Sequence, residues 1–161
     1  MQNLNSNRVV QSLPLSILRK PALNQSLPLG EPKLGLAQEA FSELIISGGK
    51  QQFLALLAPV LQSLSHEQAD RWLTLVAPPE TISNQWLRSI GVNPQKTMVI
   101  SDRSPAKVMN ILRQTLSLGL SHTVVSWIDV MPEGLKQQLS RQAAYTQSKW
   151  LNIKHPFTLA C

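Results

Sequence analysis

Short apolar runs alternate with amphipathic stretches from residue 41 onward. The runs rich in β-branched and aromatic side chains predict strands at 41–47, 72–76, 97–101, 122–127 and 149–154. Between them, apolar residues at helical spacing predict helices at 50–64, 83–90, 104–118 and 133–147. Alternating strands and helices are typical of an α/β fold, so we expect a single domain with a mostly parallel sheet and helices on both faces.

Two of the predicted helices carry the clearest signals. The helix at 50–64 has apolar residues at i, i+3, i+4, i+7, i+8 and i+11, starting from Phe53. Pro59 lies inside this series and is expected to kink or shorten the helix. The helix at 104–118 begins with Ser104 and Pro105, a capping residue followed by proline at the first helical position, and Gly119 ends it.

The last two predicted elements lie at the margins of the expected sheet. The helix at 133–147 has three apolar residues on its inner face: Leu135, Leu139 and Ala143. We therefore expect it to pack shallowly at the margin of the sheet and to expose Lys136 and Arg141. The strand Lys149–Lys154 comes last in the chain. We expect it to form an exposed edge that can pair with a second copy, which would give a homodimer.

Residues 1–36 differ in composition from the rest of the chain. They are rich in Asn, Ser and Leu, and prolines recur too often for a helix or a central strand, at positions 14, 21, 28 and 32. We therefore expect a disordered leader at 1–36, the folded domain at 37–155 and a frayed tail at 156–161.

The length of 161 residues suits one domain with one hydrophobic core. The single cysteine, Cys161, excludes an internal disulfide and any metal site built from several cysteines of one chain. No apolar run approaches the roughly 20 residues that a membrane span requires, and the N-terminus lacks the pattern of a signal peptide. We therefore expect a cytoplasmic protein without a membrane partner.

The net charge of +6 is concentrated in the second half of the chain. Residues 1–80 hold 6 basic and 6 acidic side chains, whereas residues 81–161 hold 9 basic and 3 acidic ones. Such a half attracts an acidic partner. Its basic residues are scattered singly, with no basic run and no aromatic-rich binding motif, so we do not expect nucleic acid to be that partner.

One glycine-rich turn stands where an α/β nucleotidase would bind phosphate. Ser47-Gly48-Gly49-Lys50 lies between a predicted strand and a predicted helix. A phosphate-binding loop needs more glycine-rich backbone and a hydroxyl after the lysine to bind magnesium, whereas Gln51 follows Lys50. We interpret the turn as structural and expect no cofactor.

Few other side chains could carry catalysis or hold a metal. The three histidines lack the spacing that places two ligands on one helical face, so we expect no metal. Asp102 and Asp129 follow predicted strands, at the edge where α/β proteins place active sites, and they are the acid–base candidates. Loop solvation and helix capping account for both carboxylates, so we expect no enzymatic activity.

Three spaced motifs resemble one known family. RWLTLVAPP at 71–79, QWLRSIGV at 85–92 and HTVVSW at 122–127 resemble the SulA family of cell-division inhibitors in order and spacing. The similarity runs from about residue 53 to about residue 153. It implies a reduced RecA-like core without a nucleotide-binding loop. It also implies an SOS-induced protein that binds the division GTPase FtsZ stoichiometrically, blocks its polymerisation and septum formation after DNA damage, and is degraded by the Lon protease.

The resemblance places the FtsZ-binding positions of the family on Arg71, Val76, Trp86 and Lys96, with Val76 standing where some relatives have leucine. Arg and Trp are enriched at interface hot spots, and Lys96 suits an acidic partner. Structural roles are the alternative for three of them: Val76 in the core, Trp86 on the inner face of a short helix, and Arg71 bonded to carbonyls at a strand end.

Two other functions stay open from the residues alone. One is a degenerate RecA-like regulatory module that binds a recombination or translesion protein, or DNA, through the basic half, and a salt-dependent shift of labelled DNA would support it. The other is a small enzyme that uses Asp102 or Asp129. Proteolysis could begin at the leader or at the tail, because both are apolar ends of the chain.

Overall fold

A computed structural model gives the structure of the protein and describes residues 40–156. The predicted leader lies outside these residues, and so does the predicted tail except for Pro156. The expectations for both segments therefore stay predictions.

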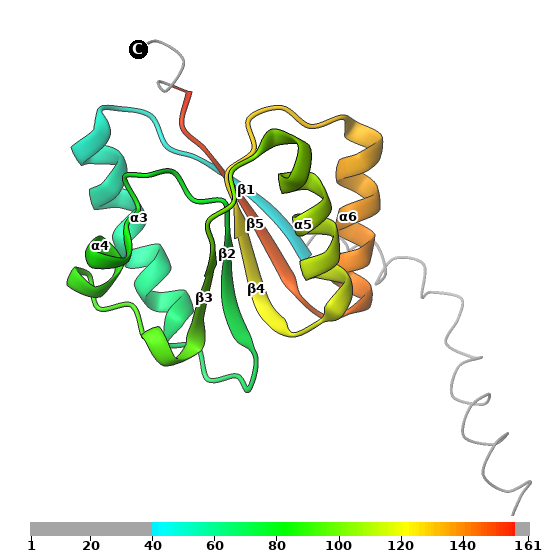
Figure 1. Ribbon diagram of the computed structural model, residues 1–161, viewed down its shortest axis with the longest axis horizontal. Coiled ribbons are helices and arrows are strands. Elements are labelled where there is room, and N and C mark those ends of the chain that lie inside the picture. The colour runs from blue at the N-terminus through cyan, green and yellow to red at the C-terminus, as the bar shows by residue number, and fades with distance from the viewer. Residues whose placement is uncertain (1–39, 157–161) are drawn as a thin grey trace, which may run out of the picture. The chain divides into compact units, whose positions relative to one another are not determined.

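Five parallel strands form one sheet in the order β1-β5-β4-β2-β3 (Figure 1). The strands are β1 (Phe41–Ile45), β2 (Trp72–Val76), β3 (Thr97–Ile100), β4 (Ser121–Ser126) and β5 (Lys149–Lys154). The predicted α/β fold with a parallel sheet is confirmed, and each strand lies at its predicted place in the chain.

Helices cover both faces of the sheet (Figure 1). One face carries α3 (Lys50–Ser65) and α4 (Asn84–Ser89), and the other carries α5 (Pro105–Leu118) and α6 (Glu133–Tyr145). A short 3-10 helix, η2 (Pro94–Lys96), leads into β3. Gly119 ends α5 in the left-handed conformation, with φ 66°, which favours glycine at that position.

Each face of the sheet has its own hydrophobic core, because side chains alternate along a strand. Leu73 and Leu75 of β2 pack against α3 and α4, whereas Val76 of the same strand packs against α5 and α6. All three side chains are fully buried. Burial on both faces explains why β2 is an almost continuous apolar run rather than an alternating one, and why all six residues of β4 are buried although only Val124 and Val125 are apolar.

Pro59 does not shorten its helix. It lies inside α3, which continues to Ser65 without a break. Proline removes one backbone hydrogen bond, but Leu57 and Leu61 on either side of Pro59 are fully buried in the core. Their packing holds both halves of the helix against the sheet, so the expectation of a shortened helix is wrong.

The last helix packs more deeply than its sequence indicates. Leu139 and Ala143 of α6 are buried, at 1% and 0% exposure. Lys136 is partly buried: its Nζ lies 5.7 Å from the centre of the Phe41 ring. Arg141 is exposed as expected. The expectations of shallow packing and of an exposed Lys136 are wrong, because Leu139 and Ala143 join the buried cluster that contains Trp150 of β5, and Phe41 of β1 lies beside Lys136.

The last strand is not an edge. β5 pairs with β1 on one side and with β4 on the other, so β1 and β3 form the two edges. The first strand of the domain joins the sheet beside the last one, and the order of strands along the chain does not reveal this. A homodimer through an exposed edge of β5 is therefore excluded.

Candidate functional site

Arg71 precedes β2 at the amino-terminal edge of the sheet and bonds to two helix ends. Its guanidinium donates hydrogen bonds to the carbonyl oxygens of Gln147 at 2.6 Å, Thr146 at 3.1 Å and Gly119 at 3.4 Å. Thr146 and Gln147 follow α6, and Gly119 ends α5. A cation is favoured there because the last carbonyls of a helix carry partial negative charge. The alternative in which Arg71 satisfies backbone carbonyls is therefore observed, at helix ends rather than at a strand end.

Lys96 lies at the same edge of the sheet, at the end of η2 and directly before β3. Its ammonium donates a hydrogen bond to the carbonyl of Ala69 at 2.9 Å, and its side chain stays partly exposed. Leu73 of β2 pairs with Thr97 of β3, so the two adjacent strands start side by side. Arg71 and Lys96 therefore belong to one surface.

A buried histidine lies behind these cations. His122 is 5% exposed, and its Nδ1 lies 3.6 Å from Oε2 of Glu67. Burial lowers the pKa of His122, and the charge of Glu67 opposes this effect. Three nearby positive charges lower the pKa further: Arg71, Lys149 and Lys96. Its surroundings therefore disfavour the protonated form of His122.

Trp86 combines a packed face with an exposed one. It lies on α4, where the Ser83 hydroxyl accepts a hydrogen bond from the Trp86 amide at 3.1 Å and caps the helix. The indole packs against the core beneath α3 and α4 and remains partly exposed. Trp86 thus has the inner-face role of the structural alternative and still offers surface to a partner.

Val76 is fully buried beneath α5 and cannot touch a partner directly in this structure. It ends β2 at the carboxyl-terminal edge, roughly 16 Å along the strand from Arg71. Ala77 follows with a positive φ of 54° and turns the chain into Pro78 and Pro79. The structure therefore separates Val76 from the surface of Arg71 and Lys96, and leaves it only an indirect role through the turn that follows.

Exposed apolar side chains beside Arg71 and Lys96 escaped the sequence analysis. Trp72 is 38% exposed and Met98 is 42% exposed, although both lie in strands. Met98 is exposed because β3 is an edge strand, which only the strand order reveals. Trp72 opens the apolar run of β2, and nothing in that run shows that its first side chain is exposed while the following ones are buried.

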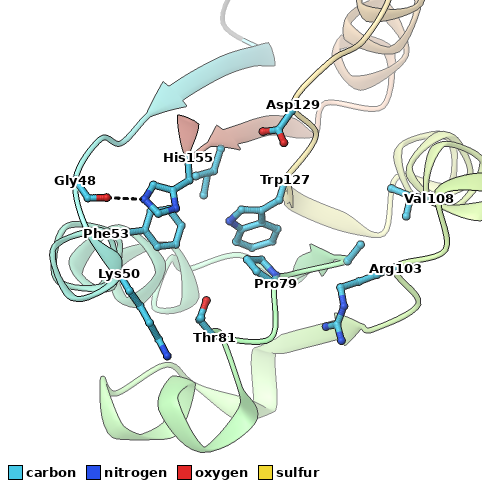
Figure 2. Close-up of a pocket in the computed structure, with 13 residues that line it drawn as sticks. Gly48, Lys50, Phe53, Pro79, Thr81, Arg103, Val108, Trp127, Asp129 and His155 are labelled. Atoms are coloured by element: carbon cyan, nitrogen blue, oxygen red, sulfur yellow. Dashed lines mark hydrogen bonds between the residues drawn. The ribbon is translucent and has the colours of Figure 1, made fainter. Parts of the chain in front are cut away.

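A cavity of about 470 Å³ lies at the opposite, carboxyl-terminal edge of the sheet (Figure 2). The turn before α3, the loops that follow β2, β3 and β4, and the end of β5 surround it. His155 donates a hydrogen bond from Nε2 to the carbonyl of Gly48 at 2.9 Å and stacks on Phe53 with ring centres 4.3 Å apart. The end of β5 is thereby fixed to the glycine turn.

The glycine turn has a backbone role at this cavity. Gly48 adopts a φ of 117°, and a Cβ at this position would collide with the Gln52 side chain. Gly49 is the N-cap of α3 and has no side chain to cap it. The conformation of Gly48 therefore requires glycine at that position, whereas Gly49 has an ordinary φ of −72° and open space around it.

The two acid–base candidates have different surroundings. Asp102 accepts a hydrogen bond from the Ser104 amide at 3.0 Å and lies 3.4 Å from Nζ of Lys107. The Ser104 bond is the main cause that holds the pKa of Asp102 below its usual value. Asp129 is exposed and lines the cavity. Asp102 therefore stabilises the loop that enters α5, and the structure does not bring the two carboxylates into one site.

Residues 40–156 contain no cluster of three or more histidine, cysteine or acidic side chains placed to hold a metal ion. Within the same residues, no helix has both the length and the apolar character needed to cross a membrane.

Comparison with known proteins identifies relatives of this chain. The family model described as cell division inhibitor SulA matches residues 40–150. A cell division inhibitor SulA from Pseudomonas aeruginosa is 44% identical over 115 residues, which cover 71% of each chain. One from Serratia marcescens is 27% identical over 110 residues, which cover 68% of this chain and 64% of the relative.

A solved structure shares the fold as well. The crystal structure of SulA from Pseudomonas aeruginosa has a TM-score of 0.69 to this chain at 43% identity, and the match covers 72% of this chain and 98% of that one. The family match contains β1 to α6 and all four positions named from the resemblance. This chain therefore belongs to the SulA family of cell-division inhibitors.

Proposed function

We propose that this protein stops division by binding FtsZ subunits stoichiometrically in the cytoplasm, so that they are withdrawn from polymer and no septum forms after DNA damage. The observation that carries the proposal is the SulA family match over residues 40–150. The SOS setting and removal by Lon follow from the same relationship. Inhibition by binding requires no catalytic turnover, and Asp102 already has a structural role at the start of α5.

The amino-terminal edge of the sheet supports the proposal as the contact surface. It presents the cations Arg71 and Lys96 with the exposed apolar side chain of Trp72 between them in sequence. Interfaces combine aromatic anchors with arginine, and cations steer an acidic partner. Trp86 on α4 is a further partly exposed aromatic side chain that a partner could contact, whereas the buried Val76 lies at the opposite edge and would act only through the turn after β2.

The affinity that this model needs is ordinary for such a surface. Reversible binding near ~1 μM corresponds to about −8 kcal/mol. A standard interface buries about 800 Å² on each partner, and a few well-packed anchors supply most of its binding energy. One or two aromatic side chains and the two cations are therefore the types of residue that can supply this binding energy.

The test is sedimentation of GTP-dependent FtsZ polymer with increasing amounts of this protein. Wild type should remove polymer near one to one. Lys96→Glu should need about tenfold more protein, because a reversed charge at an interface costs on the order of 1.4 kcal/mol or more. Arg113→Glu is the matched control: it reverses an exposed charge inside α5 rather than before a strand, and should keep wild-type potency within about twofold.

Three results would count against parts of this proposal. Undiminished polymer with folded wild type would exclude FtsZ sequestration. It would favour the alternative of a regulatory module that binds a recombination protein or DNA. Inhibition far below one to one would exclude simple withdrawal of subunits. Equal potency of the two variants would leave the function intact and remove Lys96 from the contact surface.

A further inference from the structure

We propose that the cavity at the carboxyl-terminal edge of the sheet binds a small organic anion with a planar apolar body, of the aryl carboxylate class. Its volume of about 470 Å³ lies within the roughly 300–1,000 Å³ that small-molecule sites occupy. The cavity opens at the edge opposite Arg71 and Lys96. It is therefore a site additional to the proposed FtsZ surface and does not depend on it.

The walls of the cavity suit a flat apolar molecule. Phe53 is buried and stacks on His155, and Trp127 lies beside Pro79 and faces this aromatic pair in Figure 2. Ile153 adds an aliphatic side chain from β5. Aromatic faces and proline rings present broad surfaces, and a planar ligand contacts several of them at once. These walls favour an aromatic body over a sugar or a hydrated phosphate.

The indole of Trp127 leaves one polar atom without a partner. Its Nε1 is buried, and no atom of the described residues accepts a hydrogen bond from it. In Figure 2 the nitrogen points toward the side of the cavity where Phe53 lies. A buried N–H without an acceptor is unfavourable, so an acceptor oxygen on a ligand would gain a hydrogen bond that the folded chain does not supply.

Two cations mark the end of the cavity that would hold the negative charge. Lys50 is exposed at the start of α3, and no residue of 40–156 forms an ion pair with it. Arg103 donates to the carbonyl of Pro78 at 3.0 Å and pairs with Glu80 at 3.2 Å. The two cationic side chains extend in the same direction in Figure 2, and Asp129 lies at the other end. The amino terminus of the 16-residue α3 adds positive potential beside Lys50.

This charge arrangement also orients the ligand. Asp129 repels a second negative group, so a monoanion would enter with its carboxylate accepting a hydrogen bond from Trp127 Nε1 on the side facing Lys50, and with its ring against Phe53 and Pro79. The arrangement disfavours a cationic ligand, which Lys50 would repel. A neutral ligand would not form an ion pair with the Lys50 ammonium. The inference is therefore specific to one charge type and one orientation.

The experiment is a titration of the full chain with 2-naphthoate, followed by the proton–nitrogen resonances of the tryptophan side chains. Trp127→Phe assigns the Trp127 indole signal. We expect that signal to shift saturably with a millimolar or tighter dissociation constant. Lys50→Ala should weaken binding about three- to fivefold, because one partly exposed ion pair contributes about that much to an affinity. Arg113→Ala should leave the affinity unchanged.

The neutral isostere 2-naphthamide separates charge from shape and should bind at least about threefold more weakly. No saturable shift of the Trp127 signal in folded protein would overturn the site. Equal affinity for naphthoate and naphthamide, or no effect of Lys50→Ala, would overturn the choice of an anion. Lys50 is exposed, so its replacement leaves the core intact and the charge test stands even where Trp127→Phe disturbs the fold.

Discussion

Replacing Arg71 with methionine should lower the free energy of unfolding by about 2 kcal/mol. Methionine keeps an apolar stem of similar length but removes the hydrogen bonds to Gln147 at 2.6 Å and Thr146 at 3.1 Å. A hydrogen bond from a charged donor contributes about 1.5–3 kcal/mol when buried. Arg71 is partly exposed, so water replaces part of each bond, and the 3.4 Å contact with Gly119 adds little.

Urea unfolding followed by circular dichroism at pH 7 measures this effect. With a slope of about 2 kcal/mol per molar urea, the midpoint should fall by about 1 M. Arg71→Lys is the informative second variant, because its single ammonium reaches fewer carbonyls and should recover about half of the loss. A midpoint within about 0.2 M of wild type for Arg71→Met would refute the conclusion that this side chain ties α5 and α6 to β2.

The result also decides how loss of inhibition by an Arg71 variant is read. A variant that unfolds more easily reduces the concentration of folded inhibitor without touching the contact surface. Sedimentation with Arg71→Met must therefore be run under conditions in which nearly all of the variant is folded. Lys96 gives the cleaner test of the surface, because its one hydrogen bond to Ala69 leaves the helix ends unaffected.

Two further predictions concern stability. Asn152→Leu should lower the free energy of unfolding in urea by about 3 kcal/mol. The substitution leaves the buried Ser126 hydroxyl and both backbone groups of Ile128 without their amide partner. A loss below about 1 kcal/mol would contradict the importance of these hydrogen bonds. His122→Gln should flatten the pH dependence of stability. The depressed pKa of His122 means that the unfolded chain binds more protons, so wild type loses stability as the pH falls below the ordinary value of 6.5. The lowered pKa values of Glu43 and Asp102 act in a separate window, below about 4.5. An unchanged slope between about pH 5.5 and 7 in His122→Gln would contradict this assignment.

The elements of the fold follow from local patterns, and their arrangement does not. Apolar runs and helical spacing located the five strands and the helices α3 to α6, because burial on one or two faces leaves a period of 2 or 3.6 in the sequence. The short η2 was not predicted. The place of β5 beside β1 depends on residues more than a hundred positions apart, such as Phe41 and Trp150. Nothing in the local pattern of 149–154 distinguishes a central strand from an edge.

For the candidate site too, some features follow from the sequence and others appear only in the structure. The resemblance named Arg71 and Lys96, and the structure places both of them just before parallel strands at one edge of the sheet. The carbonyls that Arg71 binds lie up to 76 positions away in sequence, so its role at two helix ends was not predictable. The exposure of Met98 and the unpartnered indole of Trp127 also depend on which elements end up as neighbours.

A parallel sheet separates the two proposed surfaces of this chain. Its strands all start at one edge, so residues just before strands, such as Arg71 and Lys96, gather there. Residues just after strands, such as Trp127 and His155, gather at the other edge and line the cavity. The fully buried core of β2 and β4 lies between the two groups. Substitutions at one edge should therefore alter contact with a partner or uptake of a small anion, and not both.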